Sequence, residues 1–183
     1  MQPAPRNAII LARLSDLRDD DERGADGQVS DGHDYARRIG WAIGPRLTHV
    51  IIENNEAGSG LRGVSAFKRR RIALPDGRAE LRTVRPGFRR ALAMLADGRA
   101  DGLIALDLDR AMRDPRDLED LIDLVEQSSP RIPVESVSGS LRLANDADIT
   151  LARVMCAVAN KASRDTALAL SVIAASVSWD LLQ

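Results

Sequence analysis

Four short apolar runs, separated by segments with helical spacing, constrain the fold of this 183-residue chain more than any other feature. The runs at residues 8–14, 48–53, 102–108 and 132–137 have the length and composition of buried strands. Between them, apolar residues recur every three or four positions, first from Gln28 to Arg38, then after Pro86 and again after Pro115. This alternation of strands and helices predicts an α/β fold with a mostly parallel sheet.

The segments between these elements complete the predicted organisation. Residues 16–27 and 54–63 are expected to be loops, and Pro75-Asp76-Gly77 predicts a turn inside the basic segment 65–81. Residues 7–145 are expected to form one domain, followed by a long helix at 146–169. Because no strand follows that helix, it can extend from the domain and pack on a partner.

Composition excludes several classes of site. The single cysteine, Cys156, excludes an intramolecular disulfide, and with only His33 and His49 a Cys/His zinc site is not expected. Aromatic residues make up 3% of the chain, which argues against base stacking as the main binding mode. The N-terminus lacks a secretory h-region and no membrane span is predicted, so we expect a soluble, cytoplasmic protein.

Positive charge is concentrated in one segment, although the formal net charge of the whole chain is only −1. Residues 62–90 carry ten basic and two acidic side chains, whereas the segments before and after are both net acidic. A genome rich in G and C would explain why arginine replaces lysine here, but not why the arginines cluster. The cluster favours an anionic partner such as a phosphate backbone.

Two polar groups of residues follow predicted strands, at the sheet edge where open α/β folds bind their ligands. The first is Arg13-Leu14-Ser15, in which Arg13 and Ser15 share one side of the strand. The second is residues 109–113, in which Arg110 and Arg113 share one face if the segment is helical. A serine beside several guanidiniums suits phosphoryl transfer. Alternatively, Ser15 caps a loop, Asp109 caps a helix, and both arginines are solvated.

The order of these motifs resembles the catalytic domain of the serine recombinases, the resolvase and invertase superfamily, and most closely its large serine integrases. The resemblance covers residues 7–166 and depends on five motifs, in the family's order: Leu11-Ala12-Arg13-Leu14-Ser15, Gln28 with Tyr35-Ala36 and Gly40-Trp41, Ser65-Ala66-Phe67, Arg85-Pro86-Gly87-Phe88, and Asp109-Arg110-Ala111-Met112-Arg113. Leu11 stands where the family has a tyrosine. Each motif alone is weak, but five in order are specific.

The resemblance implies a three-layer α/β domain with a projecting C-terminal helix, and a site for cutting and rejoining DNA. Ser15 would be the nucleophile, attacking a phosphodiester to form a 5′-phosphoserine linkage and release a 3′-hydroxyl. Asp109 would orient the arginines or assist proton transfer, and Gln28 would support the site. No cofactor, metal or small-molecule substrate is implied. The scissile phosphate would be held by four arginines: Arg13, Arg85, Arg110 and Arg113.

The resemblance also implies partners for the last helix. The helix would pair two subunits, which would assemble into a tetramer on double-stranded DNA, while Arg153, Lys161 and Arg164 face the DNA. A core helix of a monomer is the alternative. Many family members carry a glutamate where this chain has residues 160–164, which places the details of subunit packing in question.

The chain departs from the family after Thr166. Family members continue with basic residues that lie along DNA, but residues 167–183 contain no lysine or arginine and end in an apolar tail at 170–183. We expect a truncated product, with a frameshift near codon 167 as its origin. The alternatives are a naturally short protein, and a catalytically silent remnant that acts as a dimerising interaction or interference protein. A flavodoxin-like phosphate enzyme fits less well, because the loop after the first strand is too acidic.

Overall fold

The computed structural model describes residues 3–13, 20–53, 69–73, 79–83, 85–106, 108, 112, 114–139 and 142–161. Several predictions therefore lie outside the described residues. They concern the Ser65-Ala66-Phe67 motif, the helix beyond residue 161, the tail at 170–183, and the side chains of Ser15, Asp109, Arg110, Arg113 and Arg164. In the described part of the chain, no helix is long and apolar enough to cross a membrane.

Four strands form one parallel sheet in the order β2-β1-β5-β6. Their bounds are Val50–Glu53 for β2, Ala8–Arg13 for β1, Gly102–Ala105 for β5 and Val134–Ser136 for β6. The register pairs Ile10 of β1 with Val50 of β2, and Ala8 of β1 with Gly102 of β5. The parallel sheet predicted from the apolar runs is confirmed.

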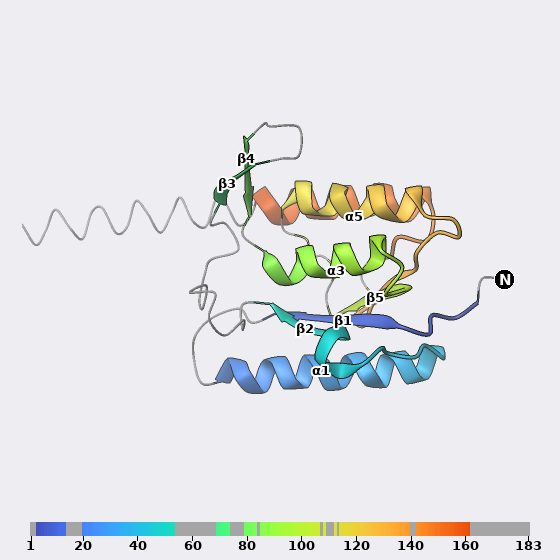
Figure 1. Ribbon diagram of the computed structural model, residues 1–183. Helices are drawn as coiled ribbons and strands as arrows, with labels where there is room; N and C mark the ends of the chain where they lie inside the picture. The colour runs from blue at the N-terminus through green and yellow to red at the C-terminus, as the bar shows by residue number, and fades with distance from the viewer. Residues whose placement is uncertain are drawn as a thin grey trace, which may run out of the picture.

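Helices cover both faces of this sheet and make three layers (Figure 1). α1 (Asp20–Ile39) packs on one face, while α3 (Pro86–Ala96) and α5 (Pro115–Gln127) pack on the other. Successive side chains of the strands belong to two different hydrophobic clusters, one on each face of the sheet. Ile9 lies in the cluster with Phe88, and Ile104 lies in the cluster with Tyr35. Burial on both faces explains why β1 is a continuous apolar run.

Helix starts agree with the sequence in two cases and differ in one. α5 begins where predicted, with the Asp114 side chain accepting a hydrogen bond from the Arg116 amide at 3.1 Å. α3 begins with Pro86 at its first turn, as predicted. The loop predicted for residues 16–27 is wrong from Asp20 onward, because α1 starts there. Its first turn carries Asp20, Asp21 and Glu22, whose charges favour a helix N-terminus.

Two further strands form a separate antiparallel ribbon between β2 and α3 in the chain. β3 (Arg69–Ala73) pairs with β4 (Ala79–Thr83), and the predicted turn falls in the interval between them. The sequence pattern predicted that turn but neither strand. A short helix, α2 (Arg46–His49), precedes β2 and was also not predicted.

The C-terminal helix spans residues 146–161 within the described part of the chain. Its inner face places Ile149, Ala152 and Cys156 in the same core as α3 and α5. Its outer face exposes Leu151, Val154 and Val158, which are 51%, 56% and 65% accessible. The described portion therefore packs along the domain on one side and presents apolar residues on the other.

Candidate active site

The sheet places β1 and β5, the strands that precede the two predicted catalytic segments in the chain, beside each other. β1 and β5 are hydrogen-bonded neighbours, but the chain leaves them toward opposite faces, to α1 after β1 and to α5 after β5. Such a switch point opens a crevice at the carboxyl edge of a parallel sheet. β1 ends at Arg13 and β5 ends at Ala105, so both strands finish at this edge before the predicted catalytic residues Ser15 and 109–113 are reached in the sequence.

Gln28 of α1 holds the end of β1. The Arg13 amide donates to Oε1 of Gln28, and Nε2 of Gln28 donates to the Arg13 carbonyl, both at 3.0 Å. The side-chain amide thus satisfies both backbone groups of Arg13, as a neighbouring strand would. Gln28 therefore fixes the backbone at the end of β1. The structure brings Gln28 and Arg13 together, and their roles in the site stay predictions.

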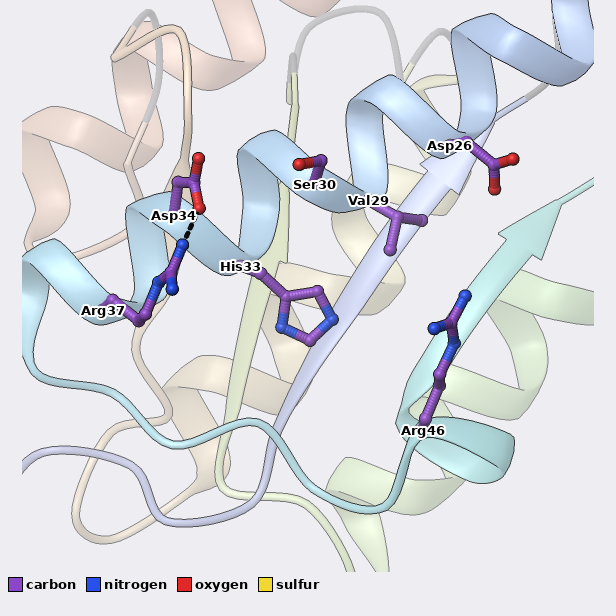
Figure 2. A pocket seen from close by; sticks show the side chains of 7 residues that line it. All are labelled: Asp26, Val29, Ser30, His33, Asp34, Arg37 and Arg46. Carbon is purple, nitrogen blue, oxygen red and sulfur yellow. Dashed lines mark hydrogen bonds and ion pairs between the residues drawn. The ribbon is translucent and has the colours of Figure 1, made fainter.

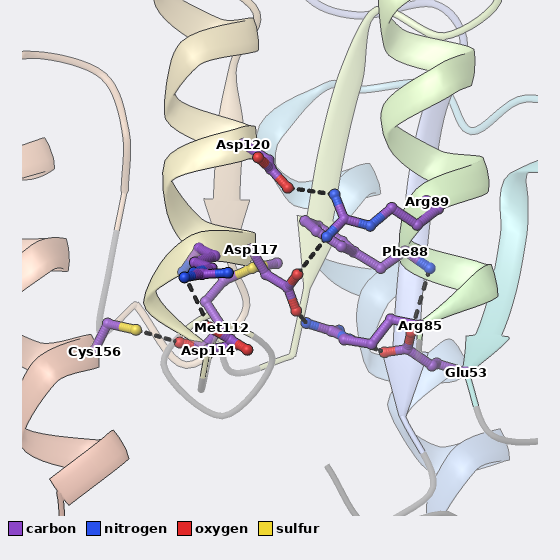
Figure 3. Close-up of polar contacts among 10 residues, drawn as sticks. Glu53, Arg85, Phe88, Arg89, Met112, Asp114, Asp117, Asp120 and Cys156 are labelled. Atoms are coloured by element: carbon purple, nitrogen blue, oxygen red, sulfur yellow. Dashed lines mark hydrogen bonds and ion pairs between the residues drawn. The ribbon is translucent and has the colours of Figure 1, made fainter. Parts of the chain in front are cut away.

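Arg85 lies at the N-terminus of α3 and is 8% exposed, in contact with two buried carboxylates (Figure 3). Its Nε and Nη2 donate to Oε2 of Glu53 at 2.9 and 2.5 Å, and its Nη1 donates to Oδ2 of Asp117 at 3.2 Å. Glu53 also accepts a hydrogen bond from the Phe88 amide in the first turn of α3. The guanidinium stacks over the Phe88 ring at 4.6 Å.

Arg89 extends this cluster to the surface of α5. It donates to Oδ1 of Asp117 at 2.6 Å and pairs with Asp120. We name Glu53, Arg85, Arg89, Asp117 and Asp120 the α3 ion network. It joins the end of β2, the start of α3 and the first turns of α5, so it fixes three elements around the carboxyl edge of the sheet.

Burial shapes the electrostatics of this network. Burial raises the pKa of the Asp117 carboxyl above its ordinary range, although Arg85 and Arg89 oppose the shift. Burial alone would lower the pKa of Arg85, but Glu53 and Asp117 outweigh it and raise that pKa. The side chains of the network are therefore charged and depend on one another. Removing one of them leaves others buried without a counter-charge.

Leu106, Leu108 and Met112, which lie between β5 and α5 in the chain, each form a hydrogen bond with another element. The amide of Leu108 donates to Oγ of Ser136 at 3.4 Å, and that hydroxyl donates to the Leu106 carbonyl at 3.1 Å. The Cys156 thiol donates to the Met112 carbonyl at 2.6 Å. Burial raises the pKa of this thiol to about 11, which keeps it protonated and able to donate.

The described residues predicted to bind DNA lie on the outer part of the C-terminal helix. Arg153 makes a bidentate pair with Glu119 of α5, with both N–O distances at 2.8 Å, and this hydrogen bonding lowers the pKa of Glu119. Lys161 is exposed. In this structure Arg153 therefore connects the helix to α5, and its contact with DNA stays a prediction.

A hollow between α1 and α2 is a second concave feature (Figure 2). Its charged side chains have mixed signs, and one pair among them, Asp34 with Arg37, is already formed. None of the predicted site residues borders it; it is lined by Asp26, Val29, Ser30, His33, Asp34, Arg37 and Arg46. Among the described residues, no group of three His, Cys, Asp or Glu side chains is placed to hold a metal ion.

Several of these contacting residues were missed by sequence reasoning. Glu53, Asp117 and Ser136 are polar residues inside apolar patterns, and this is the signal that could have identified them. The sequence pattern assigned Cys156 no contact beyond excluding a disulfide and a zinc site, and it placed Arg89 only in the basic cluster. Their partners lie 28 to 44 residues away in sequence, so spacing alone could not pair them.

Comparison with known proteins agrees with this geometry. The family model for the resolvase N-terminal domain matches residues 75–168, slightly more than half of the chain. The chain belongs to the resolvase N-terminal domain family. The matched segment includes α3, β5, α5 and β6 together with Arg85, Asp109, Arg110 and Arg113. The resemblance seen in the sequence motifs is confirmed at the level of the family.

Two solved structures share the fold of this resolvase-family chain. The N-terminal catalytic domain of TP901-1 integrase is 18% identical with a TM-score of 0.56, and the match covers 88% of this chain and 98% of that one. A resolvase family site-specific recombinase from Streptococcus pneumoniae is 11% identical with a TM-score of 0.55, and the match covers 93% and 99%. No curated protein matches the chain in sequence.

Proposed function

We propose that this chain is the catalytic domain of a site-specific DNA recombinase that cuts and rejoins DNA through a covalent serine intermediate. The family match over residues 75–168 is the observation that carries the proposal. The described geometry supports it, because Gln28 and the α3 ion network stabilise the carboxyl edge from which both predicted catalytic segments start.

In the proposed reaction, Oγ of Ser15 attacks the phosphorus of a DNA phosphodiester. A bond forms between Oγ and phosphorus, the bond to the 3′ oxygen breaks, and the serine proton ends on the released 3′-hydroxyl. The reverse attack by a 3′-hydroxyl of another strand end restores a phosphodiester and frees Ser15. Because each step exchanges one phosphate ester for another, rejoining needs no nucleotide cofactor.

Arginine side chains would stabilise the negative charge that builds on the phosphate. Arg13, Arg110 and Arg113 are assigned this role, and Asp109 would orient them or assist proton transfer. Arg85 was assigned to the phosphate too, but its guanidinium is buried between two carboxylates. In this arrangement it acts as a positioning residue for α3, and direct contact with DNA would require the α3 ion network to open.

The proposed partners are duplex DNA and further copies of the chain, which pair as dimers and assemble into a tetramer on DNA. The outer face of the C-terminal helix supports pairing, because Leu151, Val154 and Val158 expose an apolar strip at helical spacing. We propose that this strip packs against the same strip of a second copy of the chain.

Trapping of the covalent intermediate tests the function. The probe is a randomised duplex library in which sulfur replaces the bridging 3′ oxygen, since the released thiol rejoins poorly. The wild-type chain should form a protease-sensitive DNA adduct that resists denaturation, and Ser15→Ala should form none. Ser30→Ala, which removes an exposed hydroxyl from α1, is the matched control and should behave as wild type. An adduct in Ser15→Ala would overturn the assignment of the nucleophile.

A further inference from the structure

The β3–β4 hairpin stands apart from the sheet that builds the site. It forms its own two-stranded sheet, inserted between the end of β2 and the start of α3. Figure 1 shows it at the end of the molecule where β2 finishes and α3 begins. Its last residue, Thr83, is two positions before Arg85, so the hairpin leads directly into the α3 ion network.

The register of the hairpin concentrates positive charge. Its ten strand residues include four arginines and one glutamate, Glu80. Arg70 is directly paired with Arg82, so two arginines occupy opposing positions of one ribbon face. Arg69 and Arg71 occupy alternate positions of β3 and share the other face, and Arg71 is exposed. Both faces of the ribbon thus carry arginines.

This arrangement is unfavourable for an isolated ribbon. A two-stranded hairpin is only marginally stable in water, and like charges directly opposite each other destabilise a strand pair. A polyanion laid against the ribbon would offset the like charges that the register assigns to the paired positions 70 and 82. The remainder of the chain is net acidic, so a polyanion would be repelled from most of the surface and attracted to this segment.

We propose that the β3–β4 hairpin is a DNA-binding element that contacts the phosphate backbone of duplex DNA beside the active site. The inference rests on the proposed function, which supplies DNA as the substrate. Arginine charge without base-specific geometry gives binding that is independent of sequence and sensitive to salt. Because the hairpin runs into α3, its contact with DNA also fixes the position of DNA relative to the carboxyl edge.

Salt-dependent binding to a random-sequence duplex tests the element. The hairpin variant combines Arg69→Gln, Arg70→Gln, Arg71→Gln and Arg82→Gln. The control variant combines Arg37→Gln, Arg38→Gln, Arg46→Gln and Arg99→Gln, which removes the same charge from exposed sites elsewhere. The slope of log affinity against log salt should become shallower by about 2 to 4 in the hairpin variant, since each phosphate contact contributes about 0.9. The control should keep the wild-type slope.

A single substitution separates binding from a structural role. Arg82→Glu places opposite charges at the paired positions 70 and 82, so the hairpin should become more stable while DNA affinity falls. If Arg82 served only to stabilise the fold, thermal stability and DNA affinity would fall together. Thermal unfolding followed by circular dichroism, measured beside DNA binding, distinguishes the two results.

The outcomes also separate this inference from the proposed function. If the wild type forms the Ser15 adduct but both four-arginine variants weaken equally, or neither changes, the hairpin proposal is overturned while the recombinase proposal stands. If no adduct forms but binding depends on the hairpin, the hairpin proposal stands and the recombinase proposal fails. Failure of the wild type to bind the duplex at all would also overturn the hairpin proposal.

Discussion

Arg85 illustrates, at the residue scale, how one side chain can be needed for both the fold and the site. Its guanidinium forms ion pairs with both Glu53 and Asp117, which are each 1% exposed. A buried ion pair gives little net stability compared with apolar packing, but losing one partner is costly because the other charge stays buried. The arginine therefore specifies where α3 begins relative to β2 more than it adds to stability.

Replacing Arg85 should expose this dependence. Arg85→Met is expected to lower the free energy of unfolding by about 3 to 5 kcal/mol, because two carboxylates lose their buried cation. Without Arg85 the pKa of Asp117 should rise further. A carboxyl whose pKa is higher in the folded chain than in the unfolded chain destabilises the fold as pH rises, so the deficit should grow from about pH 4 upward. Urea unfolding of Arg85→Met and the wild type at pH 4, 5.5 and 7 measures this difference in the free energy of unfolding.

Arg89→Met is the matched control for that experiment. Arg89 belongs to the same network, but its side chain is 34% exposed. Water can therefore occupy the place of its guanidinium when the side chain is removed. Its substitution should cost less and depend less on pH. Equal losses for the two variants would contradict the view that Arg85 is the central cation.

The C-terminal helix shows, at the element scale, how the core and the predicted catalytic segment are connected. The same helix that buries Ile149 and Ala152 also donates a hydrogen bond from Cys156 to the Met112 carbonyl. Met112 lies one residue before Arg113 in the sequence, so the docking of this helix fixes the backbone next to that predicted site residue.

Cys156 is the chain's single cysteine and therefore reports on this docking. Because burial raises the pKa of its thiol to about 11, only about one molecule in a thousand carries the reactive thiolate at pH 8. Iodoacetamide should label the native chain slowly, and labelling should accelerate in Ile149→Ala, which loosens the helix. Ala157→Ser, on the exposed side, should leave the rate unchanged. Mass spectrometry over time provides the measurement, and rapid labelling of the wild type would contradict the docking.

Prediction from sequence succeeded for elements defined by local pattern. The apolar runs identified β1, β2, β5 and β6, and prolines with capping residues identified the starts of α3 and α5. The start of α1 was missed because a segment rich in Asp, Arg and Gly suggested a loop, whereas acidic residues in a first turn favour a helix. The β3–β4 ribbon was missed because four arginines obscure its alternation.

The site was predictable only in part, for a different reason. Motif order suggested the segments at 13–15 and 109–113 because each comes at or after the end of a strand, whereas Gln28, expected to open a helix, lies inside α1. The reciprocal bonds of Gln28 with Arg13, and the pairing of Arg85 with Glu53 and Asp117, join residues 15 to 32 positions apart. Such pairs depend on how the elements pack, which a pattern read along the chain does not contain.

At the scale of the whole molecule, two surfaces differ in chemistry from the rest. The basic hairpin lies before α3, and the apolar strip of Leu151, Val154 and Val158 lies on the outer side of the C-terminal helix. One suits a phosphate backbone and the other suits a second copy of the chain. Proposed assembly and DNA contact therefore use different elements of the same domain.

Polar substitution of the apolar strip should prevent pairing without unfolding the domain. The combined variant Leu151→Gln, Val154→Gln and Val158→Gln is expected to shift the mass in sedimentation equilibrium from dimer to monomer. The melting temperature of the variant should stay close to that of the wild-type monomer, because these side chains are exposed in the monomer. Leu47→Gln, at a residue 93% exposed on α2, is the control and should remain dimeric. A wild type that stays monomeric at high concentration would contradict the proposed pairing.

The central position of β1 has a consequence for how the chain reaches its fold during synthesis. Ala8 pairs with Gly102, and the Arg6 and Asn7 amides bond to the Asp101 carboxylate, so the first strand made needs partners made much later. At typical elongation rates about 5 to 20 s separate the two strands. Throughout that interval β1 lacks β5, the neighbour on one of its two sides. Formation of the sheet, and with it the carboxyl edge, must therefore wait until more than half of the chain has left the ribosome.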